Sequence, residues 1–162
     1  MIKLDFQDIY NEHKDKVWSL TSRYVSSQAD KEDLFQEVFL KIHQALPKFR
    51  GESALSTWIY RITVNTALNF LEKRSRQKKL LDLLSRFSLH EAEEPVEFND
   101  AVWKPLEKLN PQQRMILLLS DVEERKLEEI GTLLKLPLGT VKSTLHRARE
   151  IIKKEVMKNG DL

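Results

Sequence analysis

The C-terminal stretch 137–154 constrains the fold of this chain more than any other segment. Its apolar residues fall on one stripe of a helix, because they recur at steps of four, three and four: Val141, Leu145, Ala148 and Ile152. The opposite face has hydrogen-bond donors and almost no acid: Lys142, Ser143, His146, Arg147 and Arg149. A shorter helical pattern over 127–134 precedes it, across a short link with Pro137 and Gly139. This arrangement predicts a helix-turn-helix.

An ordinary amphipathic helix with a solvated basic face would show the same periodicity. Three details favour a helix that binds in a DNA groove. Gly131 is small where the two helices must cross, the link between them is short, and Lys and Arg are mixed with Ser, Thr and His. Such side chains suit contacts with base edges and phosphates, so we predict that this helix lies in the major groove of DNA.

The net charge of +2 conceals an uneven distribution along the 162 residues. Residues 137–158 contain six Lys or Arg and two Glu, whereas residues 87–100 contain five acids and no Lys or Arg. A basic tail after an acidic middle points to a nucleic-acid partner. With four Gly, five Pro and no alternating Val/Ile/Thr runs, the chain is predicted to be all-α, with two small helical domains joined by a linker.

Several classes of protein are excluded by composition. The absence of cysteine excludes disulfides and thiolate metal sites and fits a reducing cytoplasm. No apolar run is long enough to span a bilayer, and no signal peptide is visible. The four His residues are scattered, which argues against an enzyme that acts on nucleic acid. We therefore expect a cytoplasmic protein without membrane insertion, enzymatic activity, metal or cofactor.

The first half of the chain predicts two packed helices. Apolar residues at three- and four-residue steps indicate a helix from Phe6 to Tyr24. Asp30 is predicted to cap a second helix, which runs on through 33–46 until Pro47 ends it. Asp33, Gln36 and Glu37 share one face of that helix by their spacing. Solvation alone is enough to explain such a face.

A loop over 49–55 and a helix from Ser56 or Thr57 to Leu71 combine aromatic residues with Arg and Asn. Aromatic residues interleaved with Arg and Asn can stack on and read unpaired bases. The residues concerned are Phe49, Arg50, Trp58, Tyr60, Arg61 and Asn65. Spacing alone favours a core position for Trp58. Residues 75–100 are predicted to be a linker whose first part can be helical, and Asn110-Pro111 predicts the start of a later helix.

Four blocks in order resemble the sigma-70 family of bacterial transcription initiation factors, specifically the small extracytoplasmic-function (ECF) type. The matching segments are 33–40, 49–53 with 57–62 and Asn65, 109–119, and 127–131 with 139–143 and 147–149. The resemblance implies a domain over 1–74 that binds polymerase and melts the −10 element, a linker over 75–100, and a domain over 101–158 that reads the −35 element. In such a linker the acidic stretch would either mimic nucleic acid or act as a solvated tether.

The resemblance also implies roles for individual residues. The polymerase-binding residues would be Asp33, Gln36 and Glu37, which match the contact with the β′ coiled coil. The −10 pocket would comprise Phe49, Ser53, Leu55 and Asn65, supported by Trp58, Tyr60 and Arg61. Base contacts at −35 would come from Lys142, Ser143, His146 and Arg147, with Thr140 and Arg149 on phosphates. The implied partners are the β and β′ subunits of core RNA polymerase, promoter DNA and an anti-sigma factor.

Departures from the family pattern fall in the helix-turn-helix. Thr144 stands where many members carry a basic residue, which indicates that a DNA contact is missing there. Lys135 stands where helix-turn-helix motifs favour Gly, and a left-handed turn there would cost about 1 kcal/mol. The main rival interpretation is a stand-alone helix-turn-helix regulator. The 33–37 face and the 49–65 block argue against it, because such a regulator needs no element that melts DNA.

Overall fold

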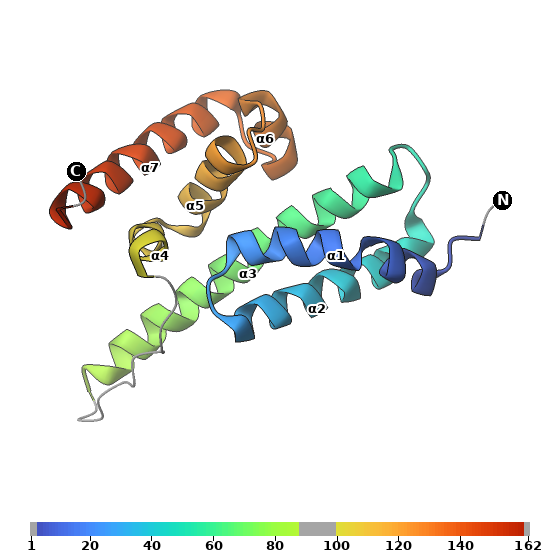
Figure 1. The fold of residues 1–162 in the computed structure, drawn as a ribbon, viewed down its shortest axis with the longest axis horizontal. Helices are drawn as coiled ribbons and strands as arrows, with labels where there is room; N and C mark the ends of the chain where they lie inside the picture. The colour runs from blue at the N-terminus through green and yellow to red at the C-terminus, as the bar shows by residue number, and fades with distance from the viewer. Residues whose placement is uncertain (1–2, 88–99, 161–162) are drawn as a thin grey trace. The chain divides into compact units, whose positions relative to one another are not determined.

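The computed structural model describes residues 3–87 and 100–160, and within these ranges it contains helices and no strand (Figure 1). This confirms the predicted all-α fold. By backbone contacts the chain divides into two compact units, Met1–Asn69 and Phe70–Leu162, and helix α3 crosses the boundary. Each unit has its own buried apolar residues.

The first unit is built from α1 (Phe6–Tyr24), α2 (Gln28–Ala45), the 3₁₀ turn η1 (Leu46–Lys48) and the beginning of α3 (Leu55–Ser85). Helix α1 packs on α2, and α3 completes the core with its own buried face. The large hydrophobic side chains that are fully buried in this unit are Val17, Tyr24, Leu34, Val38, Ile42 and Val64. Edge-to-face aromatic contacts join α1 to α2, for example Tyr10 with Phe39 at 4.8 Å and Trp18 with Phe35 at 5.5 Å between ring centroids.

The N-cap of helix α2 lies three residues earlier than predicted. The N-cap is Ser27, whose hydroxyl oxygen accepts a hydrogen bond from the Asp30 backbone N–H at 3.1 Å. The prediction that Asp30 caps this helix was therefore wrong. Asp30 instead lies in the first turn, where a carboxylate interacts favourably with the positive end of the helix. The predicted helix Phe6–Tyr24 is confirmed with the same bounds.

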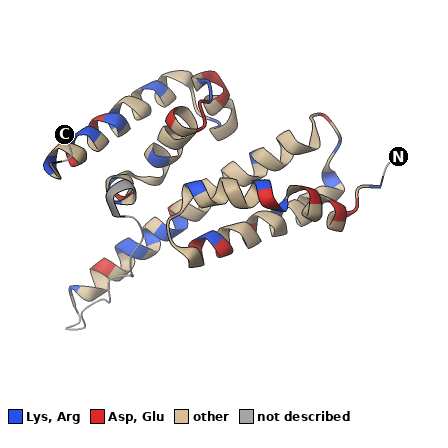
Figure 2. Cartoon of the chain, viewed as in Figure 1, with Lys and Arg blue, Asp and Glu red and all other residues tan. Residues whose placement is uncertain are grey.

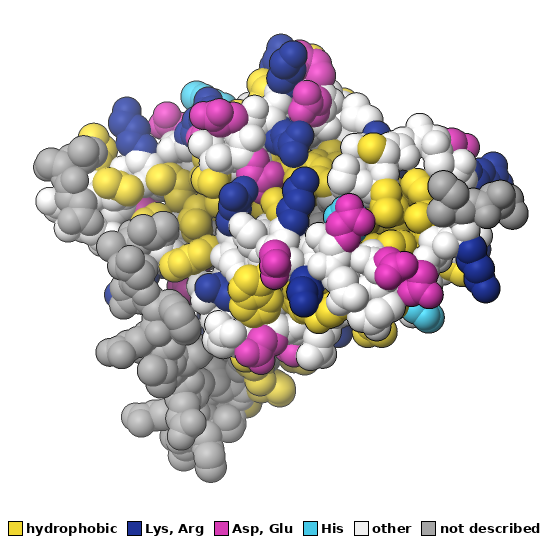
Figure 3. Space-filling model, turned by 45° about the vertical axis from the view of Figure 1, so that its right-hand side comes forward, with side chains coloured by type: hydrophobic (Ala, Val, Ile, Leu, Met, Phe, Trp, Pro, Cys, Tyr) yellow, Lys and Arg dark blue, Asp and Glu magenta, His cyan; other side chains and the backbone are white. Residues whose placement is uncertain are grey.

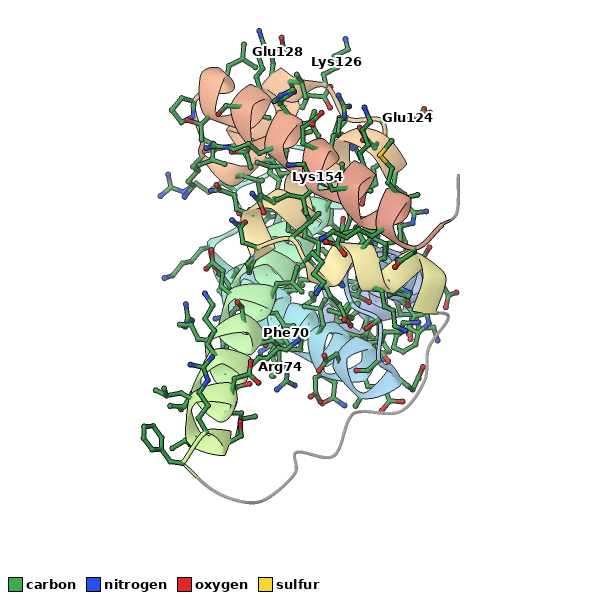
Figure 4. The ribbon with its side chains drawn as sticks, turned by 90° about the vertical axis from the view of Figure 1, so that its left-hand side faces the viewer. Phe70, Arg74, Glu124, Lys126, Glu128 and Lys154 are labelled. Atoms are coloured by element: carbon green, nitrogen blue, oxygen red, sulfur yellow. The ribbon has the colours of Figure 1, made fainter. Side chains whose placement is uncertain are left out.

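Helix α3 continues into the segment predicted as a linker and ends at Ser85. Its second half contains no Gly or Pro and is rich in Lys, Arg, Gln and Leu, which favour helix. Within it, the Arg74 guanidinium lies over the Phe70 ring, 4.9 Å from the ring centre (Figure 4). Most of the predicted acidic stretch lies outside the described residues.

The second unit contains α4 (Asp100–Glu107), α5 (Pro111–Leu117), the π-helical turn η2 (Leu118–Val122), α6 (Leu127–Leu134) and α7 (Leu138–Lys158). Helices α4, α5 and α6 all contact α7. The core residues that are fully buried are Met115, Ile116, Leu119, Ile130, Val141 and Ala148. Helix α7 is thus supported along its length by shorter helices, which hold it as a rigid platform.

Asn110 begins α5 as predicted. Its side chain accepts a hydrogen bond from the Gln113 backbone N–H at 2.8 Å, and the Gln113 side chain accepts one from the Asn110 backbone N–H at 3.0 Å. Pro111 occupies the first helical position, where no N–H is needed. This capping box fixes the start of the second unit's core helix.

Candidate nucleic-acid interface

Helix α7 presents one apolar face to the core and one polar face to solvent. Val141, Thr144, Leu145 and Ala148 are buried, which leaves the predicted base-reading side chains on the outside (Figure 2 shows the basic side chains along α7). All four predicted base-reading residues are exposed, and of the two predicted phosphate contacts Arg149 is exposed and Thr140 is half-buried: the base-reading ones are Lys142, Ser143, His146 and Arg147. The helical spacing therefore brings these predicted residues to one accessible side.

Thr144 lies on the inner face of α7 and only 4% of its surface is exposed. A residue at this position cannot reach DNA without leaving the core. Thr144 itself therefore makes no DNA contact in this position, and the expectation that one contact of the family is missing here stays a prediction. A basic side chain at this position would have to extend out of a buried site.

The turn between α6 and α7 is held by a very close backbone approach. The Leu136 N–H donates to the Gly131 carbonyl oxygen at 2.8 Å, and a Cβ added to Gly131 would lie 2.8 Å from the Leu136 oxygen. The same Cβ would lie 3.6 Å from Val141 of α7. As predicted, Gly131 lies where α6 and α7 cross closely. The closest contact of an added Cβ would be with the Leu136 oxygen in the turn, and not with α7.

Lys135 adopts the left-handed conformation anticipated at this turn, with φ 56° and ψ 46°. It is the C-cap of α6, and its backbone N–H bonds to the Gly131 oxygen. A left-handed residue at this place reverses the chain direction and lets α7 begin three residues later. The turn geometry thus sets the angle at which α7 leaves α6.

Arg147 and Ser143 are linked along the outer face of α7. The Arg147 Nη2 donates to the Ser143 hydroxyl at 3.4 Å, and that hydroxyl donates to the Thr140 carbonyl oxygen at 3.2 Å. Three of the predicted DNA contacts therefore form one chain of weak hydrogen bonds on the surface. Such a chain restrains a long side chain while leaving other donors of the guanidinium available.

Arg149 is paired with an acidic residue that the sequence interpretation did not single out. Its Nη2 lies 2.6 Å from Oδ1 of Asp121, and its Nε donates to Oδ2 at 3.1 Å. These hydrogen bonds lower the pKa of the Asp121 carboxyl, helped by Ser120 and opposed by partial burial. The same contact raises the pKa of Arg149. Nothing in the spacing of residues 28 apart could have revealed this pair.

The predicted −10 residues lie on the loop before α3 and on its first turns. The Phe49 ring packs against Trp58, with ring centroids 4.8 Å apart and planes tilted by 45°. Trp58 is half-buried, so it is not the fully buried core residue that spacing favoured. Gly51, with φ 70°, turns the intervening loop. Ser53 and Leu55 are half-buried at the entry to α3.

Helical geometry groups three of these residues and separates a fourth. At roughly 100° per residue, Trp58, Arg61 and Asn65 lie on one outward face of α3. The Asn65 side-chain amide donates to the Arg61 carbonyl oxygen at 2.9 Å, which holds it along the helix. Tyr60 is two residues from Trp58, so it faces a different direction, toward the side of α3 on which Val64 and Ala67 are buried, although Tyr60 itself is half-buried. Of the residues predicted to contact the −10 element, Trp58, Arg61 and Asn65 therefore share one face of α3, whereas Tyr60 does not.

The predicted polymerase-binding residues lie side by side on α2. Asp33 and Gln36 are exposed and Glu37 is half-buried, while Leu34 and Val38 point into the core. Half-buried Phe35 lies next to them in sequence. On the face shown in Figure 3, basic and acidic side chains are interspersed rather than gathered by sign. On α2, the two carboxylates of Asp33 and Glu37 lie one helical turn apart.

The part of the chain that the structure describes offers neither a metal site nor a membrane-spanning helix. There, no group of three or more His, Cys, Asp or Glu side chains is arranged to hold a metal ion. Within the same residues, none of the helices has both the length and the apolar character needed to cross a bilayer.

Comparisons with protein families match both units in order. The family model for sigma-70 region 2 matches residues 9–77, and that for sigma-70 region 4 matches residues 100–152. The ECF RNA polymerase sigma-E factor of Escherichia coli (strain K12) is 38% identical over 158 residues, which cover 89% of this chain and 82% of the relative. The RNA polymerase sigma-H factor of Pseudomonas aeruginosa is 33% identical over 94% of this chain and 86% of that relative.

Solved structures support the same fold. The sigma factor RpoE of Bartonella quintana, in complex with the anti-sigma factor NepR, matches with a TM-score of 0.63 at 22% identity, over 95% of this chain and 97% of that one. CnrH in complex with the cytosolic domain of CnrY matches with a TM-score of 0.60 at 18% identity, over 94% and 88%. The chain therefore belongs to the sigma-70 family of RNA polymerase sigma factors, as an alternative, ECF-type sigma factor that directs promoter-specific transcription.

Proposed function

We propose that the chain directs core RNA polymerase to its promoters through two separate DNA-reading surfaces. The observation that carries the proposal is the exposed donor face of α7, supported from behind by three shorter helices. On this face Lys142, Ser143, His146 and Arg147 contact base edges of the −35 element in the major groove. Thr140 and Arg149 contact backbone phosphates at its margins.

The second surface opens the −10 element. The loop 49–55 and the first turns of α3 receive a base flipped from the non-template strand, and Phe49, Ser53, Leu55 and Asn65 form the pocket. Trp58 and Arg61 support it by stacking and by contact with the strand, and Tyr60 supports it from the side. Flipping costs a few kcal/mol of unstacking, which the aromatic pair of Phe49 and Trp58 offsets.

Polymerase binds the acidic face of α2. Asp33, Gln36 and Glu37 contact the β′ coiled coil, and the second unit contacts the β subunit. The packed aromatic residues behind this face support it, because a rigid helix presents its carboxylates in a fixed arrangement. Phosphoryl transfer belongs to the core polymerase, so the chain carries out no covalent step of its own.

Regulation by an anti-sigma factor is part of the proposal. Two solved structures with this fold are complexes with another protein, the anti-sigma factor NepR in one and the cytosolic domain of CnrY in the other. An anti-sigma factor that holds the chain away from polymerase would act in the cytoplasm, where transcription takes place.

The test is co-purification with bacterial core RNA polymerase, followed by run-off transcription from genomic fragments. We expect core binding and new start sites, from which both promoter elements can be aligned. A double charge reversal, Asp33→Lys with Glu37→Lys, should abolish core binding in a chain that remains helical by circular dichroism, whereas Asp8→Lys on α1 should not. Tight binding to duplex DNA without core binding would instead support a stand-alone regulator.

A further inference from the structure

Asp121 lies in an unusual segment that joins α5 to α6. The turn η2 is π-helical, and the Glu123 N–H bonds to the Leu118 oxygen at 3.0 Å while the Arg125 N–H bonds to the Leu119 oxygen at 2.9 Å. Glu124, which follows it, has φ 54° (Figure 4 labels Glu124 in this connection). Wide turns and a left-handed non-glycine residue are unfavourable conformations that the surrounding structure must maintain.

The carboxylate of Asp121 accepts two hydrogen bonds from one edge of the Arg149 guanidinium. The pair uses Nε and Nη2, at 3.1 and 2.6 Å from the two carboxylate oxygens. Both hydrogens of Nη1 and the second hydrogen of Nη2 are not used by this carboxylate. Even when paired, 54% of the Arg149 side chain is exposed. Asp121 therefore fixes one edge of the Arg149 guanidinium and leaves the N–H donors of the other edge available for a ligand.

Arg149 lies in a basic row along α7. Lys142, His146, Arg149 and Lys153 follow one another at steps of four, three and four, and all are exposed. Arg149 is thus aligned with two of the residues proposed to read the −35 element. A guanidinium at this place, fixed in orientation, suits a phosphate at the edge of the groove.

We propose that Asp121 is a positioning residue for DNA recognition, which orients Arg149 so that its open edge meets a backbone phosphate. This rests on the proposed function of α7. The alternative role for Asp121 is competition with DNA for Arg149, and it predicts a different result. If Asp121 only competed with DNA for Arg149, its removal would strengthen DNA binding, because a negative charge beside the groove would disappear. The two roles therefore predict changes of opposite sign.

The experiment uses holoenzyme reconstituted from the full chain and core polymerase, on a promoter obtained from the run-off assay. Promoter affinity is measured over a range of salt concentrations for the wild type, Asp121→Ala, Arg149→Ala and the double variant. Asp121→Asn, which keeps the size of the side chain, replaces Asp121→Ala if the latter is less folded by thermal melting. The matched control is Glu150→Ala, which removes a neighbouring acid of α7.

We expect Asp121→Ala and Arg149→Ala each to weaken binding about three- to tenfold, and the double variant to be no weaker than Arg149→Ala alone. Each should also reduce the salt slope by about one, the signature of a lost phosphate contact, which a purely structural role would not change. Tighter binding by Asp121→Ala, or an unchanged slope, would overturn the inference. A wild-type chain that forms no promoter-selective holoenzyme would overturn the proposed function as well.

Discussion

The two candidate DNA surfaces hold their side chains in different ways. On α7, long donors extend from one helix, and both of its Arg residues are restrained, Arg147 by Ser143 and Arg149 by Asp121. On the loop and α3, the restraint comes from aromatic packing of Phe49 on Trp58 and from a local amide contact. Reading an intact duplex requires donors at fixed spacing, whereas holding an unpaired base requires a stacking surface beside an adaptable loop.

The largest effect is expected from a substitution that disrupts the α7 surface and leaves the surface on the loop and α3 intact. Gly131→Ala should destabilise the second unit by about 3 kcal/mol, because the new methyl group would lie 2.8 Å from the Leu136 backbone oxygen. The first unit should unfold as in the wild type. Urea unfolding followed by hydrogen exchange resolves the two units.

Gly139→Ala is the matched control for this change. A Cβ at Gly139 would meet nothing within 4 Å, and the residue lies in the first turn of α7. Alanine there should be neutral or slightly stabilising. Equal losses from both alanine variants would show that the close approach at Gly131 is not what holds the turn.

Arg147→Ala sharpens the assignment of α7 as the sequence reader. Loss of a direct base contact should cost about 2 kcal/mol at the preferred −35 sequence and much less at altered sequences. Competition binding with a set of single-base −35 variants measures this. A loss of equal size at every sequence would make Arg147 a phosphate contact instead.

Trp58→Ala tests whether the other surface acts on opened DNA. Loss of its ring against Phe49 should weaken binding to a promoter with an unpaired −10 region by about 1 to 2 kcal/mol. Binding to fully paired DNA should change little. Trp58→Phe serves as the control, because it keeps an aromatic surface. An equal effect on paired and unpaired DNA would contradict the assignment.

Lys135→Gly tests whether the left-handed conformation in the turn before α7 lowers the stability of the second unit. Since Lys135 has φ 56°, glycine should stabilise the second unit by about 1 kcal/mol. Lys135→Ala keeps the strained conformation and removes the charge, so it should not stabilise. Thermal melting of the three chains distinguishes a backbone effect from a charge effect, and stabilisation by alanine would indicate the latter.

Sequence reasoning succeeded where the signal was local and periodic. The stripe from Val141 to Ala148 and the dipeptide Asn110-Pro111 each determine a helix face or a helix start within a few residues. The left-handed conformation of Lys135 was anticipated because helix-turn-helix motifs favour Gly at this place. The cap of α2 was missed because Ser27 and Asp30 are both good capping residues, and spacing does not choose between them.

Features that depend on tertiary packing could not be predicted. The pair of Asp121 and Arg149 joins residues that the chain brings together only because α5 packs on α7 and η2 follows directly after α5. The length of α3 was underestimated because its basic second half is equally typical of a solvated linker. The inward orientation of Thr144 follows from the rotation of α7, which a resemblance by position does not give.

The smallest expected effect is a change in the free energy of unfolding at acidic pH. It concerns the ion pair of Asp121 and Arg149 on the α7 side and has no counterpart in the aromatic pair of Phe49 and Trp58, which does not titrate. Because Arg149 lowers the pKa of folded Asp121, the unfolded chain binds a proton more readily. The stabilisation is therefore fully present above the ordinary carboxyl pKa of about 3.9 and is lost as the pH falls through the lowered value.

Both side chains are more than a third exposed, so solvent screening limits this contribution to about 0.5 kcal/mol. The free energy of unfolding of the wild type should exceed that of Asp121→Asn by this amount at pH 6, and the difference should decrease toward pH 2. Glu150→Gln provides the control for general charge effects. A difference that grows at acidic pH would mean that the pair does not stabilise the folded unit through the charged carboxylate.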